Sequence, residues 1–209
     1  MGRIIAGVLV LSAGVGCGIL DAAKNESAGG TFTLNVASPE ASNATPGTFE
    51  AKTITGSYAT GVNPNLTDAG WSVITGTPNV LDTTTCKSVA LGFAGKPAAG
   101  EVITLVDYNP DVTDGGPVDL NGKGFLIYDE GCVTAGPVKE WRSSGGTIQI
   151  TAVADPDSQP SGAIPGANKK VSFSYSGVSM AFQGDGGLAT GTFTADGTGT
   201  VDLFAGMSL

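Results

Sequence analysis

The sequence contains no histidine. Histidine is the side chain that enzymes use most often for proton transfer near neutral pH, and it is the commonest transition-metal ligand in proteins. Its absence excludes catalysis by Ser-His-Asp or Cys-His groups, and it excludes zinc sites that depend on histidine. Mechanisms that use carboxylates alone, or a serine beside a lysine, are compatible with the sequence.

Positive charge is also scarce. The chain has 10 lysine and arginine residues against 19 aspartate and glutamate residues, for a net charge of −9. A surface of this sign repels nucleic acid phosphates and anionic membrane surfaces, so we expect no nucleic acid partner. Charged residues make up only 14% of the chain, whereas there are 33 glycines and 11 prolines. This composition favours short strands joined by many turns over helices.

The N-terminal segment is a long apolar stretch. Residues 4–20 carry no charge, follow Arg3 and contain small residues near their end, which is the layout of a secretory signal. We therefore expect export. Two outcomes are open for such a segment. It can be an ordinary signal peptide, which would give a secreted or periplasmic protein, or an uncleaved segment about long enough to span a bilayer.

The residues AGVGC, which end at Cys17, resemble the end of a bacterial lipoprotein signal. In that family a small residue, here Gly16, precedes a cysteine that is lipidated and becomes the new N-terminus. Gly14 departs from the large aliphatic residue that is usual at its place. The resemblance implies a signal peptide over residues 1–16, a lipid anchor with palmitate-type acyl chains on Cys17, and, because Gly18 follows, sorting to the outer membrane or cell surface.

The other two cysteines fit this expectation. Three cysteines in an exported chain leave one over after pairing. If Cys17 takes lipid, Cys86 and Cys132 can form one disulfide in an oxidising compartment. That bond would close a loop of about 45 residues and stabilise the fold by about 3 to 4 kcal/mol.

The rest of the chain divides into a tether and one domain. Residues 17–30 are polar, end in glycine and show no periodic pattern, as is typical of a flexible linker. In residues 31–209, apolar and polar residues alternate in short runs separated by turn residues. The runs that we predict as strands are 31–36, 47–55, 71–75, 87–93, 101–107, 124–128, 147–153, 171–182, 188–195 and 199–204. The sequence therefore predicts an all-β antiparallel sandwich, with a closed β-barrel as the alternative.

The alternation is strictest over residues 171–182, where it is interrupted once. The apolar spacing widens from two to three at Gly177, and a single glycine inserted into a strict alternation indicates a β-bulge. Asp196 and Gly197 form a turn dipeptide. We therefore predict that the last three strands form an antiparallel meander.

Oxygen-bearing side chains concentrate between residues 107 and 121, and calcium prefers oxygen ligands in number. This segment resembles the start of a calcium loop, although Val112 stands where the helix-loop-helix version needs glycine. The candidate ligands are Asp107, Asn109, Asp111 and Asp114. The alternative is a solvated turn in which these side chains cap local backbone groups.

Catalytic machinery is hard to find in the sequence. A carboxylate-pair glycosidase needs two acids held across a cleft, and no spacing singles out a pair. The acids available are Glu50, Glu101, Asp107, Asp129, Glu130 and Glu140. Ser172 beside Lys169 and Lys170 is better explained as the polar face of a strand, and we expect Trp71 and Trp141 to pack in the core or at its edge.

These observations give three functional hypotheses. The first is a cell-envelope lipoprotein that is not an enzyme and presents a binding or structural module to a protein or glycan partner, with no cofactor unless calcium binds. The second is a carrier in which Phe173, Tyr175 and Phe182 face a cavity that holds a small apolar ligand. The third is a carboxylate-dependent hydrolase.

Overall fold

The computed structural model describes residues 30–37, 42–51, 53–59, 71–77, 87–107, 123–131, 139–156, 169–182 and 189–205. The strands are β1 (Gly30–Ala37), β2 (Gly47–Ala51), β3 (Thr53–Ala59), β4 (Trp71–Thr77), β5 (Lys87–Ala94), β6 (Val102–Leu105), β7 (Lys123–Glu130), β8 (Lys139–Gly145), β9 (Thr147–Ala154), β10 (Lys169–Phe182) and β11 (Thr192–Ala205). The prediction of an all-β chain is confirmed. Across these ranges no helix has the length and hydropathy needed to cross a membrane.

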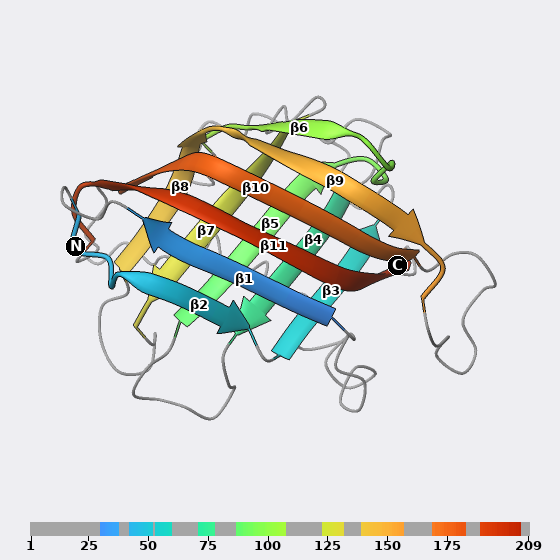
Figure 1. Cartoon of the computed structure of the whole chain (residues 1–209), viewed down its shortest axis with the longest axis horizontal. Coiled ribbons are helices and arrows are strands. Elements are labelled where there is room, and N and C mark those ends of the chain that lie inside the picture. The colour runs from blue at the N-terminus through green and yellow to red at the C-terminus, as the bar shows by residue number, and fades with distance from the viewer. Residues whose placement is uncertain are drawn as a thin grey trace, which may run out of the picture.

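The strands form two layers that pack face to face (Figure 1). The front layer has the order β2-β1-β11-β10-β9-β6, and the back layer has the order β3-β4-β5-β7-β8. The strands of the two layers cross at a steep angle in Figure 1, as they do in orthogonally packed sandwiches. The predicted sandwich is therefore confirmed.

The two layers are joined at their corners. The end of β11 pairs in parallel with β3 through Phe204 and Ala205. The end of β10, from Ser179 to Phe182, pairs with β8, and β6 pairs with both β7 and β9. Because these corner pairings are short, the strands make two packed faces and not the one evenly closed barrel of the alternative prediction.

The core lies between the layers and draws its aromatic side chains from both. The inward residues of β1 alternate strictly: Phe32, Leu34 and Val36 are buried. The ring of Phe32 meets that of Phe173 edge to face, with their centroids 5.2 Å apart. Such contacts add about 0.5 to 1.5 kcal/mol beyond the burial of the rings themselves.

The predicted bulge lies at Gly177. The pairing of β10 with β11 shifts register between Tyr175 and Val178, and Gly177 has a φ of 64°. Asp196 on β11 caps the bulge, because its Oδ1 accepts hydrogen bonds from the Ser176 hydroxyl and the Gly177 N–H, both at 2.8 Å. The bulge keeps the apolar side chains on either side of it in the core.

The predicted turn at Asp196 and Gly197 is wrong, and so is the meander that depended on it. These residues lie inside β11, which runs without a break from Thr192 to Ala205. A Cβ on Gly197 would lie 2.1 Å from the Thr33 carbonyl oxygen and 2.4 Å from the Tyr175 hydroxyl. The glycine is there because the Tyr175 ring covers the strand at that point, as aromatic side chains do opposite strand glycines.

Two other strand predictions need correction. The single strand expected over 47–55 is two strands, because β2 ends at Ala51 in the front layer and β3 begins at Thr53 in the back layer. The strand β8 was not predicted. Its sequence, KEWRSSG, shows no alternation because Trp141, Arg142 and Ser143 are all buried.

Candidate functional site

β7 is buried on both of its faces, and it ends with two consecutive acids. Leu126 and Tyr128 face the core between the layers, whereas Phe125 and Ile127 form a small separate apolar cluster on the outer face of the back layer. Because side chains alternate along a strand, Asp129 belongs to the outer face and Glu130 to the inner one. Two polar networks are built on these acids.

The inner network surrounds the carboxylate of Glu130, which is buried. Its Oε1 accepts hydrogen bonds from the Thr45 N–H at 2.9 Å and the Tyr128 hydroxyl at 3.0 Å. Its Oε2 accepts one from the Thr45 hydroxyl at 3.0 Å. Two ammonium groups complete the shell, with Lys87 Nζ 3.3 Å from Oε1 and Lys139 Nζ 3.7 Å from Oε2.

These partners decide the charge of Glu130. Burial by itself raises the pKa of a carboxyl group, but the Thr45 N–H, the Lys87 charge and the two hydroxyl donors outweigh it, so the pKa of Glu130 lies below its ordinary value. Burial and the neighbouring Glu130 charge raise the pKa of the Tyr128 hydroxyl, which stays protonated as a donor. The network therefore favours the ionised form of Glu130.

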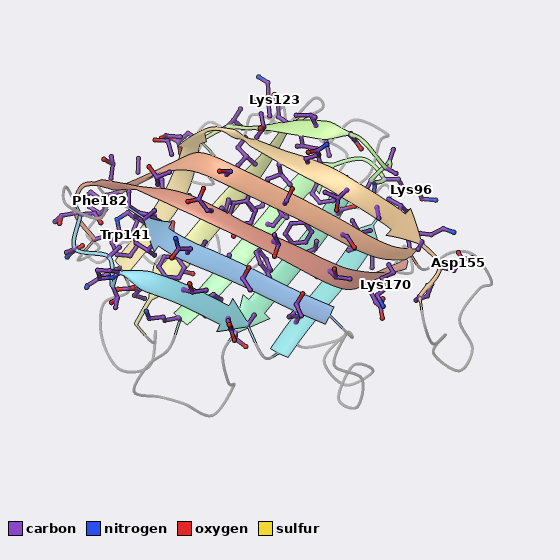
Figure 2. The ribbon with its side chains drawn as sticks, in the orientation of Figure 1. Lys96, Lys123, Trp141, Asp155, Lys170 and Phe182 are labelled. Atoms are coloured by element: carbon purple, nitrogen blue, oxygen red, sulfur yellow. The ribbon has the colours of Figure 1, made fainter. Side chains whose placement is uncertain are left out.

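The inner network closes one end of the sandwich. Lys139 Nζ donates to the Asn43 carbonyl oxygen at 2.9 Å, and the Thr190 N–H donates to the Asn43 side-chain oxygen at 2.9 Å. The Trp141 indole N–H donates to the Thr190 carbonyl at 3.4 Å. Figure 2 shows Trp141 at this end near Phe182, its register partner. Trp141 is fully buried, which confirms its predicted packing role.

The outer network surrounds Asp129. Asp129 is directly opposite Ser88 of β5 on one side and Glu140 of β8 on the other. The Ser88 hydroxyl donates to Asp129 Oδ2 at 2.9 Å, and Arg142 Nε forms an ion pair with Glu140 Oε1. Asp129 Oδ1 is buried and accepts no hydrogen bond within the part of the chain that the structure describes.

This environment weakens the acidity of Asp129. Burial is the largest cause, the Glu140 charge adds to it, and Ser88 and Arg142 only partly oppose them, which raises the pKa of Asp129 to about 7. Direct cross-strand partners have their Cβ atoms about 4.5 to 5.5 Å apart. Sequence spacing could not single out this pair of acids, because the pairing depends on the register of β7 against β8.

The predicted cysteine sites lie outside the described residues: Cys17, Cys86 and Cys132. The structure does describe residues that are close in sequence to Cys86 and Cys132, and these residues lie beside each other. Lys87 and Glu130 are paired residues of β5 and β7; Cys86 immediately precedes the first, and Cys132 follows the second by two positions.

Of the predicted calcium ligands, only Asp107 lies within the described residues, and it is exposed. Asn109, Asp111 and Asp114 lie outside them. Over the ranges given above, no three acidic or cysteine side chains gather in a way that would hold a metal ion. The calcium site therefore stays a prediction.

The other acids and the candidate Ser-Lys pair are dispersed. Glu50 is exposed on β2, and the Glu101 carboxylate accepts a hydrogen bond from the Ala98 N–H at 2.9 Å. The Ser172 hydroxyl lies 3.1 Å from the Thr200 hydroxyl, and Lys169 Nζ lies 2.7 Å from Asp155 Oδ1. Ser172 thus belongs to the polar face of its strand, as predicted.

The aromatic residues of the proposed carrier pack against the chain itself. Phe173 and Tyr175 are buried, and Phe182 packs against the same core cluster. A Cβ on Gly199 would lie 2.2 Å from the Phe173 ring, and the Tyr175 hydroxyl donates to the Thr33 carbonyl at 2.8 Å. These contacts favour a filled core over a ligand cavity at this place.

The outer face of the front layer carries a regular set of hydroxyl side chains from its three central strands. We call this set the hydroxyl face; its members are Thr33, Ser172, Ser174, Ser176, Thr198 and Thr200. The Thr33 and Thr198 hydroxyls lie 3.3 Å apart, and the register places Ser174 beside Thr198. The three threonines of the set are β-branched and have few χ1 rotamers, so the orientation of their hydroxyl groups is restricted.

No protein-family model, curated protein or solved structure matches the chain. The function is therefore argued from the residues themselves. The inner network, the outer network and the hydroxyl face are the main polar features of the described residues. In chemical terms, they offer one buried carboxylate with a lowered pKa, one weakly acidic carboxyl group and one partly exposed set of hydroxyl groups.

Proposed function

We propose that this protein is an exported, lipid-anchored β-sandwich that acts as a binding or structural module at the outer membrane or cell surface and is not an enzyme. The observation that carries the proposal is the hydroxyl face. Its members are uncharged in a chain whose net charge is −9, and each hydroxyl can still donate or accept bonds beyond its neighbour. A surface of hydroxyl groups, whose Ser176 member donates to the Asp196 carboxylate, suits a protein or glycan partner.

Two of the described carboxylates, Glu130 and Glu140, support the non-catalytic part of the proposal. The Glu130 oxygens are engaged by Thr45, Tyr128 and two lysines. Glu140 is paired with Arg142. Acids whose oxygens are bound by groups of the same chain support a fold, whereas a catalytic acid must reach a substrate proton.

The distance between anchor and sandwich is consistent with display at a surface. β1 begins at Gly30, and residues 18–29 separate it from Cys17. Fully extended, twelve residues reach about 40 Å. A tether of this length would let the hydroxyl face turn away from the membrane.

The anchoring is tested by the intact mass of the membrane-associated protein from a Gram-negative host, for the wild type and Cys17→Ala. We expect the wild-type mass to equal the chain from Cys17 plus a diacylglyceryl and an acyl group, and we expect the variant to lack this species. An unlipidated chain that begins after residue 16 would overturn the anchor and leave a secreted domain. An intact Met1 would overturn cleavage as well.

The binding role is tested on a neutral glycan array with Thr198→Arg, which places a charge in the hydroxyl face. The matched control is Ala99→Arg, which adds the same charge at an exposed position between β5 and β6. We expect the wild type and the control to bind the same glycans and Thr198→Arg to lose at least tenfold in affinity. Equal binding by all three proteins would show that the hydroxyl face is not the binding surface.

A further inference from the structure

The outer network contains an arrangement that the proposed function does not use. Two acids, Asp129 and Glu140, are directly opposite each other on antiparallel strands, so their side chains leave the sheet on the same face. The side chains of Glu140 and Arg142 are 22% and 10% exposed, so water screens the pair only partly. Two carboxylates in such a position repel each other unless a proton lies between them.

The hydrogen bonds of the network leave one place for that proton. Ser88 occupies Asp129 Oδ2, and Arg142 Nε occupies Glu140 Oε1. Asp129 Oδ1, which is buried, is the oxygen for which the described residues provide no donor. If Oδ1 carries a proton, it becomes a donor itself and can bond to the remaining Glu140 oxygen across the strand pair.

We propose that Asp129 and Glu140 hold one proton between them, so that the hydrogen bond that fastens β8 to β7 on the outer face forms only while the pair is singly protonated. The raised pKa of Asp129, with burial and Glu140 as its main causes, agrees with this assignment. Arg142 forms an ion pair with Glu140, which leaves Asp129 as the member without a positive partner in that pair. β8 continues to the corner where it pairs with β10. The pair of Asp129 and Glu140 therefore lies beside a place where the two layers join.

Among the described residues, the charged groups that influence the pKa of Asp129 come from β8. β8 contributes Glu140 and Arg142, and β5 contributes the neutral hydroxyl of Ser88. The other charged residues at this end of the three strands, Lys87, Glu130 and Lys139, pair with one another on the inner face.

The raised pKa of Asp129 makes the stability of the folded state depend on pH. Asp129 is a stronger acid in the unfolded chain than in the folded one, so its contribution to stability is full below its ordinary pKa near 4 and is lost as the pH rises through about 7. The shared proton therefore makes the folded state less stable in mildly alkaline solution than in mildly acidic solution.

The test is the folding equilibrium of the protein between pH 4 and pH 8, measured by urea unfolding with tryptophan fluorescence. We compare the wild type with Asp129→Asn, which keeps the shape of the protonated group, and with Glu50→Gln, an exposed control. We expect the wild type and the control to lose on the order of a hundredfold in folding equilibrium relative to Asp129→Asn over this range. A parallel pH dependence for all three proteins would overturn the proposal.

Direct titration keeps the proposal testable if Asp129→Asn does not fold. The carboxyl carbon of Asp129 is followed by ¹³C NMR in the wild type and in Glu140→Gln, which removes the like charge. We expect a wild-type transition near pH 7 that moves to lower pH in the variant. A transition below pH 5 in the wild type, or one that Glu140→Gln leaves in place, would show that the two acids do not share a proton.

Discussion

Asp129 and Glu130 are consecutive residues of one strand, yet they show opposite electrostatic behaviour. Glu130 meets three hydrogen-bond donors and two ammonium groups, and its pKa is lowered. Asp129 meets one hydroxyl, one acid and the arginine that is paired with that acid, and its pKa is raised to about 7. Burial raises the pKa of both acids, so the lowered pKa of Glu130 comes from the donors and the lysine around it.

The comparison shows how donors and charged neighbours on each face of a strand shift the pKa of a buried acid in opposite directions. The alternation of side chains along a strand sends neighbouring residues to opposite faces. Each face then supplies its own partners from the strands on either side: Lys87 and Lys139 inside, Ser88 and Glu140 outside. A strand can thus keep one acid ionised and the next one protonated with no change in the backbone.

The largest expected effect concerns the end of β5 and β7 where the inner network lies. If Cys86 and Cys132 are joined, reduction or Cys86→Ser should lower the free energy of unfolding by about 4 kcal/mol, because the bond closes a long loop in the unfolded chain. Urea unfolding with and without reductant measures this. Cys86→Ser, Cys132→Ser and the double variant should have equal stability; additive losses would contradict a bond between them.

The next expected effect concerns the inner network around Glu130. Glu130→Ala leaves Thr45 and Tyr128 without their acceptor and two lysines without their counterion, and we expect a loss of about 3 kcal/mol at pH 7. Glu50→Ala, on exposed β2, is the control and should change stability by less than about 0.5 kcal/mol. A loss below about 1 kcal/mol for Glu130→Ala would mean that water replaces the carboxylate freely.

The third effect concerns the outer side and has the opposite sign. Asp129→Asn should raise the free energy of unfolding at pH 8 by about 2 kcal/mol, because the amide needs no proton to stay neutral. Its effect at pH 4 should be near zero. Urea unfolding at the two pH values gives the difference, and a destabilising effect at pH 8 would mean that the Asp129 carboxylate is favoured in the fold.

The smallest expected effect concerns the stability that Glu130 contributes in acidic solution. Because the pKa of Glu130 is lowered, its contribution to stability is present above the ordinary pKa of a glutamate and is lost as the pH falls through its folded value. Glu130→Gln keeps an acceptor for Thr45 but has no charge to lose. We expect its deficit of about 1 kcal/mol at pH 7 to shrink in thermal unfolding scans at pH 3, and a constant deficit would contradict this account.

The sequence predicts the strands whose two faces differ in polarity. β1 and β10 alternate strictly, and even the bulge at Gly177 can be read from the changed spacing. β11 could not be read in this way, because Gly197 and Gly199 make room for rings on the neighbouring strand. A glycine that avoids a steric overlap and a glycine that makes a turn look alike until the partner strand is known.

The two polar networks were beyond prediction for a related reason. The sequence shows which acids are available, but nothing in the spacing of Asp129 and Glu140 shows that they are cross-strand partners. Register is fixed by which faces are buried over the whole strand, and β8 shows no alternation from which to read it. The Thr45 contact to Glu130 joins residues 85 positions apart.

The place of β11 in the front layer has a consequence for how the protein reaches its folded state. β11 is the last of the described strands along the chain, yet it lies between β1 and β10 and also touches β3. Contacts between distant parts of a chain form slowly, because a long loop must close first. As the ribosome releases the chain from the N-terminus, β1 (Gly30–Ala37) cannot pair with β11 until Thr192–Ala205 have also been made. A chain whose front layer cannot form until β11 has been made stays unfolded during most of its synthesis. Passage through a secretion channel requires an unfolded chain.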